Sequence, residues 1–198
     1  MAHTINIFVH SANHLEDVER FGKNDPYAQF TLNFEDKSFF QKTATKKNAG
    51  SDVEWDQEVN LDYYNPEDHN NLYVEVFDEE ASVDAPIGFA AIPLRQVRDA
   101  PHHSLKARYD LFRPNGDQKG TIDLTISILK PGQEARSATA GKPEEKGFSE
   151  LDAQHQHHIK NKRNLERAGD AAALLAGVAA LAGAKAVYDH QKKAAHEQ

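Results

Sequence analysis

The sequence contains no cysteine, which excludes disulfide bonds, thiolate metal sites and cysteine nucleophiles. This absence fits a reducing compartment. The first residues also lack the basic stretch followed by an apolar run that marks a secretory signal, so we expect a cytoplasmic protein. Long hydrophobic runs are missing too, because the uncharged Ala- and Gly-rich segment 171–184 is shorter than the ~20 residues that span a bilayer.

Positive charge is scarce relative to negative charge. The 198 residues include 23 Lys and Arg against 31 Asp and Glu, which gives a net charge of −8. General nucleic-acid binders neutralise phosphates with Lys and Arg, so we expect no nucleic-acid partner. The mean hydropathy of −0.72 indicates a chain that dissolves in water.

The chain divides into two parts of unlike composition. Residues 1–132 carry a net charge of −9 and hold the only Trp, five of six Tyr and nine of ten Phe. Large aromatic side chains build cores, so this part is the predicted folded domain. Residues 133–147 contain no large apolar side chain and read as a flexible linker. Residues 148–198, rich in Ala, His, Gln and Lys, read as a helical tail that includes the segment 171–184.

Short alternating, β-rich runs fill the first part of the chain. Turn residues such as Asn65-Pro66 and Pro114-Asn115-Gly116 separate them. Eight such runs in about 130 residues predict an all-β fold, an eight-stranded antiparallel β-sandwich. The expected strands are 4–10, 26–33, 37–43, 53–61, 72–77, 87–92, 107–112 and 121–129.

Acidic side chains gather in two stretches between predicted strands, 15–27 and 76–88. Carboxylates held close together repel one another unless water or a cation separates them. Hard cations such as Ca²⁺ take six to eight oxygen ligands, so two acidic loops facing each other suggest a calcium site. The alternative is that both loops are simply solvated, as most charge runs are.

Several short motifs follow one another along residues 3–130. They are Ile5-x-Ile7-x-Val9, Gly22-Lys23-Asn24-Asp25-Pro26-Tyr27, Trp55, Leu72-x-Val74-x-Val76-x-Asp78 and Ile87-Gly88. Their order resembles a C2 domain, the β-sandwich family that binds calcium and phospholipid, and the order of the strands suggests the type II topology. The overall plan resembles small fungal and plant C2 proteins with an Ala/Gly-rich tail.

The resemblance implies five metal-ligand positions for Ca²⁺. Asp25 and Asp78 match the family pattern, whereas Glu19 and Glu80 stand where Asp is usual. Asp84 lies one residue before the expected position of the last aspartate. Glu keeps the charge and can still ligate, so two interpretations stay open. The five positions form either a working calcium site or a degenerate group of carboxylates that is mainly structural.

The resemblance also implies contact with an anionic phospholipid membrane surface. Phe21 and Val83 occupy loop positions from which family members insert apolar side chains into lipid, although Phe21 could instead cap the sandwich. Alternate residues of a strand share one face, so four lysines could form a basic patch near the third and fourth strands. Edge lysines also guard against aggregation. The four are Lys37, Lys42, Lys46 and Lys47.

Nothing in the sequence predicts an enzyme. Paired carboxylates are present, but no feature separates an acid from a base, and no Gly-rich phosphate loop occurs. In the tail, a charged helix is expected from Phe148 to Arg167 with Ser149 as its N-cap. His155 and His158 share a face of that helix, which is expected to be solvated rather than to bind a metal.

Two functions remain open. The first is a peripheral membrane-targeting module, with or without Ca²⁺, whose tail self-associates, lies on the membrane or, least favoured, spans it. The second is a calcium-independent scaffold that binds proteins and oligomerises through the small residues of the tail.

Overall fold

The computed structural model describes residues 3–19, 22–135, 143 and 145–169. Eight strands follow one another in the order β3-β2-β5-β6-β7-β8-β1-β4, and all these neighbours are antiparallel. A short ninth strand pairs in parallel with β7. The strands are β1 (His3–Asn13), β2 (Pro26–Thr31), β3 (Gln41–Lys42), β4 (Val53–Tyr64), β5 (Asn71–Asp78), β6 (Ala85–Pro93), β7 (Ser104–Phe112), β8 (Gln118–Leu129) and β9 (Glu145–Lys146).

The join between β6 and β7 divides this order into two layers. These two strands meet at a single residue pair, Phe89 and Phe112, whereas the other pairings within each layer are longer. The two ends of the order, β3 and β4, also lie close together, so the sheet is nearly closed. The predicted eight-stranded antiparallel sandwich is confirmed.

Alternation along the strands places the core between the layers. In β4, Val53, Trp55 and Val59 are buried, while Glu54 and Glu58 on the other face are exposed. Fully burying one such aliphatic side chain contributes about 1.5–3 kcal/mol. The apolar residues of β1 and β8 are buried between the layers in the same way.

The predicted strand 37–43 is only partly correct. The side chain of Asp36 accepts a hydrogen bond from the backbone of Ser38 at 2.9 Å, and residues Lys37–Phe39 wind into a 3₁₀ helix, η1. Only Gln41 and Lys42 pair with β2. The Asx turn at Asp36 therefore replaces the strand that the alternation predicts over residues 37–39. Two further short helices that the sequence did not signal, α1 (Arg95–Asp99) and η2 (Pro101–His103), connect β6 to β7.

The narrow join between β6 and β7 leaves strand edges that the chain beyond β8 covers. Gly147 N–H donates to Arg108 O at 2.8 Å, and Glu150 exchanges two backbone hydrogen bonds with Ala91. The helix then starts at 153, later than the expected Phe148. Asp152, and not Ser149, caps it, because the Asp152 carboxylate accepts from His155 N–H at 2.7 Å.

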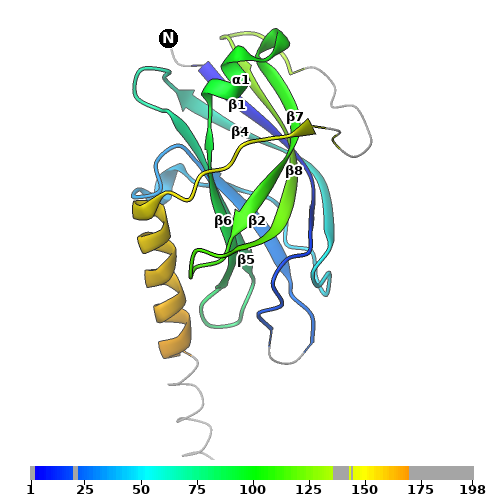
Figure 1. Cartoon of the computed structure of the whole chain (residues 1–198), viewed down its shortest axis with the longest axis vertical. Coiled ribbons are helices and arrows are strands. Elements are labelled where there is room, and N and C mark those ends of the chain that lie inside the picture. The colour runs from blue at the N-terminus through cyan, green and yellow to red at the C-terminus, as the bar shows by residue number, and fades with distance from the viewer. Residues whose placement is uncertain (1–2, 20–21, 136–142, 144, 170–198) are drawn as a thin grey trace, which may run out of the picture.

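The helix formed by residues 153–169 is anchored on the outside of the β2–β5–β6 layer. Figure 1 shows it in gold, running along the side of the strands from the middle of the molecule towards the end opposite α1. Its buried Ile159 packs with Tyr27, Phe77 and Phe89. Within the described part of the chain, no helix is long and apolar enough to cross a membrane. The Ala- and Gly-rich segment 171–184 lies outside the described residues.

Candidate functional site

Three acidic side chains converge at the end of the molecule opposite α1. Glu19 comes from the loop between β1 and β2, Asp78 ends β5, and Glu80 follows it in the next loop. One carboxylate oxygen of each lies within 4.8 Å of the other two. The structure therefore brings together three of the five predicted ligands, and we call Glu19, Asp78 and Glu80 the acidic cup.

Asp78 is the fully buried member of the acidic cup, with an exposed fraction of 0%. Its Oδ1 accepts a hydrogen bond from the backbone N–H of Asp25 at 2.5 Å. No donor among the described residues reaches its Oδ2. Burial raises the pKa of Asp78 to about 6, and the charges of Glu19 and Glu80 add to the shift.

The chemistry of the acidic cup fits a hard cation. A buried carboxylate oxygen without a partner is costly, and a bound cation removes that cost. Carboxylate oxygens are the ligands that Ca²⁺ prefers, and its coordination is flexible enough to accept Glu in place of Asp. Glu19, Asp78 and Glu80 are thus the described residues that fit an ion.

Asp25 lies beside the acidic cup but is engaged by other groups. Its Oδ1 accepts from Asn48 N–H at 2.6 Å, and its Oδ2 lies 3.0 Å from Lys47 Nζ. Lys47 also pairs with Glu79 at 2.6 Å. The backbone hydrogen bond from Asn48 and the pairing with Lys47 lower the pKa of Asp25. An internal cation, Lys47, therefore stands next to the acidic cup.

Asp84 orders the loop between β5 and β6, which we call the third loop. Its two carboxylate oxygens accept from Tyr27 Oη at 2.7 Å and from Glu80 N–H at 3.0 Å. Burial and the bond to Asp84 raise the pKa of the Tyr27 hydroxyl. Asp84 thus fixes the backbone that carries Glu80 rather than joining the group of converging oxygens.

The predicted lipid-contact residues lie in several places. Phe21 is outside the described residues, and Val83 is exposed in the third loop, beside Gly169 of the helix. Only one of the four predicted lysines is on a strand, so strand alternation does not align them on one face. Lys37 is in η1, and the ammonium of Lys42 in β3 lies 4.9 Å from the centre of the Tyr27 ring. Lys46 and Lys47 are in the loop between β3 and β4.

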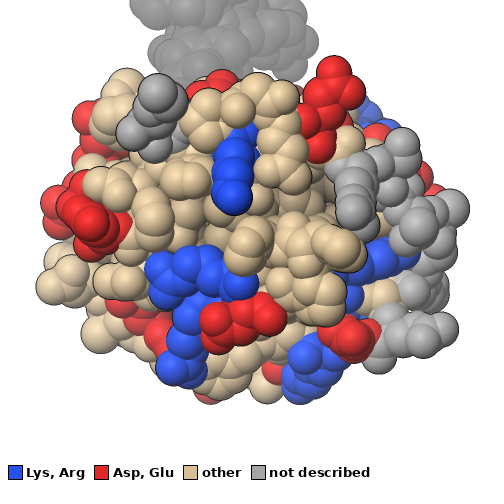
Figure 2. All heavy atoms as spheres, turned by 90° about the horizontal axis from the view of Figure 1, so that it is seen from above, with Lys and Arg blue, Asp and Glu red and all other residues tan. Residues whose placement is uncertain are grey.

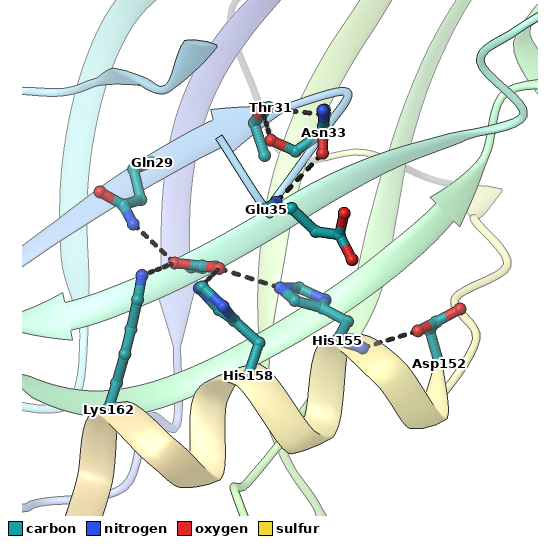
Figure 3. Close-up of polar contacts among 9 residues, drawn as sticks. Gln29, Thr31, Asn33, Glu35, Asp152, His155, His158 and Lys162 are labelled. Carbon is teal, nitrogen blue, oxygen red and sulfur yellow. Dashed lines mark hydrogen bonds and ion pairs between the residues drawn. The ribbon is translucent and has the colours of Figure 1, made fainter. Parts of the chain in front are cut away.

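A second buried carboxylate, which the sequence analysis missed, lies three residues before Asp78. Glu75 has an exposed fraction of 0%. Figure 3 shows His155, His158 and Lys162 pointing from the helix 153–169 towards the sheet. His155 Nε2 lies 3.0 Å from Glu75 Oε1, and Lys162 Nζ lies 2.8 Å from Oε2. Gln29 Nε2 donates to the same Oε2 at 2.6 Å. We call these four residues the Glu75 cluster.

The Glu75 cluster neutralises its carboxylate from within the chain. Burial alone would raise the pKa of Glu75, but the hydrogen bond from His155 and the charge of Lys162 lower it to about 2. The buried His155 ring stacks on Phe34 with centroids 5.1 Å apart, and it meets the Phe89 ring edge to face at 5.0 Å. The helix predicted to be solvated is therefore docked on the sheet.

The sequence did hold a signal for this cluster. Glu75 interrupts the apolar residues of β5, and His155, His158 and Lys162 recur at helical spacing on one face of the tail. Pairing the two required knowing that the helix returns to this strand. Burial lowers the pKa of His158, and the charge of Lys162 lowers it further.

The acidic cup therefore lies at one end of an antiparallel β-sandwich. The C2 domain family model matches residues 3–111, and the chain belongs to this family. Members of the family typically bind Ca²⁺ and lipids.

Comparison with known proteins points to plant relatives. The chain is 26% identical over 131 residues to the Protein SRC2 homolog of Arabidopsis thaliana, covering 63% of this chain and 40% of that protein. It is 26% identical to the structure of a C2 domain-containing protein from an elicitor-responsive gene, with a TM-score of 0.51 over 68% of this chain and 93% of that one.

The C2A domain of plant Extended Synaptotagmin 1 has a similar fold. Its TM-score is 0.54 at 20% identity, covering 65% of this chain and 95% of that chain. A calcium-bound structure of the C2A and C2B domains of Extended Synaptotagmin 2 gives a TM-score of 0.52 at 19% identity. The match covers 65% of this chain and 42% of that chain. At these identities the likeness concerns the fold.

Proposed function

We propose that the protein is a peripheral membrane module that binds anionic phospholipid in response to Ca²⁺. The observation that carries the proposal is Asp78, a buried carboxylate with a raised pKa and one oxygen without a donor among the described residues. Such a group is costly to the apo fold, and a cation from solution relieves it. The protein is then a binding module of the cytoplasm rather than an enzyme.

In this proposal Glu19, Asp78 and Glu80 hold the ion. Asp25 becomes a further ligand once Lys47 releases its carboxylate. Bound Ca²⁺ supplies positive charge to an acidic loop end, so that the phosphates of an anionic membrane are attracted instead of repelled. Val83, exposed in the adjacent loop, and Phe21 would enter the lipid surface. The segment 171–184 would add a second contact or join copies of the chain.

Co-sedimentation with phosphatidylserine vesicles, in Ca²⁺ and in EGTA, tests this function. We expect a Ca²⁺-dependent increase in binding that is lost in the Asp25→Asn, Asp78→Asn double variant. The control is Asp56→Asn with Asp62→Asn, which removes the same charge from β4, away from the acidic cup. Equal binding in both buffers would contradict a calcium response.

A specific observation favours one alternative. Lys47 already bridges Asp25 and Glu79, so the chain supplies part of its own neutralisation at the loop end. This arrangement suits a calcium-independent scaffold that binds proteins. Vesicle binding in neither buffer, with the protein folded, would favour that alternative over the membrane module.

A further inference from the structure

The helix 153–169 presents positive charge on a different side from the Glu75 cluster. Lys162 points from the helix towards the sheet (Figure 3) and binds Glu75, whereas Lys160, Arg163 and Arg167 line a separate cavity of about 290 Å³. Among the described residues, none of these three cations makes an ion pair with an acidic side chain. The helix therefore carries cations that its docking on the sheet does not use.

The opposite wall of this cavity is the turn between β7 and β8. It contributes Arg113 and Asn115. Arg113 is held by Asp117 at 2.7 Å and faces Glu16 at 3.5 Å, and Glu16 is the only acidic residue that lines the cavity in the described part of the chain. Arg113 is therefore largely neutralised by Asp117 and Glu16, whereas Lys160, Arg163 and Arg167 have no acidic partner among the described residues. These three leave an excess of positive charge at the cavity in a chain that is acidic overall.

The two walls are fastened together. Gln156 Nε2 on the helix donates to Pro114 O in the turn at 3.2 Å. On the other side of the helix, His155 and Lys162 bind the buried Glu75 at 3.0 and 2.8 Å. These contacts fix the helix axis, so the cavity exists before any ligand arrives, and less entropy is lost when a ligand binds.

The cavity lies at the same end of the molecule as the acidic cup. Glu16 belongs to the loop between β1 and β2 that also carries Glu19, and Gly169 at the end of the helix lies beside Val83 in the third loop. Figure 1 shows the helix running towards this end. The opposite end, around α1, is viewed in Figure 2, and there basic and acidic side chains are interspersed.

We propose that this basic cavity binds the phosphate group of an anionic membrane lipid. Guanidinium groups match phosphate oxygens in pairs, and the side-chain amide of Asn164 adds a donor. The inference rests on the proposed function, because it assumes that the loop end faces a membrane. It adds a contact that needs no Ca²⁺ and that is separate from the acidic cup.

The test compares two arginine pairs in vesicle binding. The helix pair is Arg163→Gln with Arg167→Gln, and the control pair is Arg95→Gln with Arg98→Gln on α1. Full-length chains are mixed in EGTA with phosphatidylcholine vesicles that contain phosphatidic acid. We expect the helix pair to weaken binding about 25-fold, because each of the two cations near an anionic surface contributes about fivefold. The control pair should change binding little.

A charge-conserving variant and a competitor make the result decisive. Arg163→Lys with Arg167→Lys keeps the charge but not the paired guanidinium bonds, so it should weaken binding less than the Gln pair does, which separates loss of charge from loss of the helix. Inorganic phosphate at the concentration of the lipid phosphate should not release the protein. Release by inorganic phosphate, or equal losses in the helix and control pairs, would overturn the inference.

The outcome is distinguishable from failure of the proposed function. In Ca²⁺, the Arg163→Gln, Arg167→Gln variant should bind vesicles more weakly than the wild type by the same factor as in EGTA. Adding Ca²⁺ should still increase the vesicle binding of this variant. Loss of the calcium response alone, with the helix pair still weakened in EGTA, would overturn the function proposed for the acidic cup and leave the basic cavity supported.

Discussion

Glu75 and Asp78 lie three residues apart on the same strand, and both are buried with an exposed fraction of 0%, yet their surroundings differ in kind. Glu75 meets Lys162, His155 and Gln29, and its pKa falls to about 2. Among the described residues, Asp78 accepts from the backbone N–H of Asp25 and lies near the carboxylates of Glu19, Glu80 and Asp25, and burial with these charges raises its pKa to about 6. Burial is common to both, so the partners decide the direction of the shift.

The comparison separates a carboxylate that builds the fold from one that suits a ligand. The chain neutralises Glu75 with its own cations, and in doing so it fixes the helix to the sheet. Among the described residues, it places no cation in contact with Asp78. Buried charges are stable when paired, so the unpaired one is where an external cation gains most.

The largest expected effect comes from removing the compensated carboxylate. Glu75→Ala should lower the free energy of unfolding by about 3–5 kcal/mol, because Lys162 and His155 lose the group they bind. Urea denaturation measures the change, and Glu67→Ala, an exposed carboxylate in the turn after β4, is the control. A loss below about 1 kcal/mol for Glu75→Ala would mean that its cations do not secure the helix.

Removing the charge of Asp78 should change the free energy of unfolding in the opposite direction. Asp78→Asn in EGTA at neutral pH should raise the free energy of unfolding by up to about 3 kcal/mol, the equivalent of the pKa shift from 3.8 to about 6. Asn keeps an acceptor for Asp25 N–H. The control is Asp84→Asn, which should destabilise the fold by weakening the bonds from Tyr27 and Glu80.

That prediction has a second readout. Ca²⁺ should raise the thermal midpoint of the wild-type chain and leave that of Asp78→Asn unchanged, since the variant lacks the central ligand. Stabilisation of both chains by Ca²⁺ to the same extent would place the ion elsewhere.

The two carboxylates also predict opposite pH dependences. The folded chain holds the Asp78 proton more tightly than the unfolded chain, so stability in EGTA falls as pH rises from about 4 to about 6. Glu75 has a lowered pKa, so its contribution is present above about 4.5 and is lost as pH falls towards about 2. The difference in stability between wild type and Asp78→Asn, measured by urea denaturation across this range, isolates the first effect. A difference that stays constant with pH would contradict it.

The smallest effect concerns the internal cation beside the acidic cup. Lys47→Met should strengthen Ca²⁺ binding about two- to fivefold, because Asp25 is then released towards the ion and one exposed ion pair is worth less than about 1 kcal/mol. Calorimetric titration measures the change. Lys46→Met, one residue earlier in the same loop, should leave the affinity unaltered, and weaker binding by Lys47→Met would contradict the expectation.

The sequence predicted the sandwich because strand alternation and turn residues are local signals. β1, β4 and β8 follow directly from alternating residues such as Ile5, Ile7 and Val9. The exception is the stretch before β3, where the side chain of Asp36 forms a turn that outweighs the strand pattern. The strand alternation of residues 37–43 and the turn-forming side chain of Asp36 are both local signals. Periodicity alone does not tell which of the two decides the structure.

The candidate site was less predictable. Glu19, Asp78 and Glu80 converge as the motif suggested, but Asp84 bonds to Tyr27, which lies 57 positions away in the chain. The Glu75 cluster joins residues 80 positions apart. Such pairings depend on how the tail returns to the gap between β6 and β7, and no spacing in the sequence records that path.

The most direct measurement is the titration of the two carboxyl groups by carbon NMR, in EGTA and in Ca²⁺. We expect a pKa of about 6 for Asp78 in EGTA and a shift to well below 4 in Ca²⁺, with Glu75 near 2 in both buffers. An Asp78 pKa close to the ordinary 3.8 in EGTA, unchanged by Ca²⁺, would contradict the central claim that the chain leaves this carboxylate for an external cation.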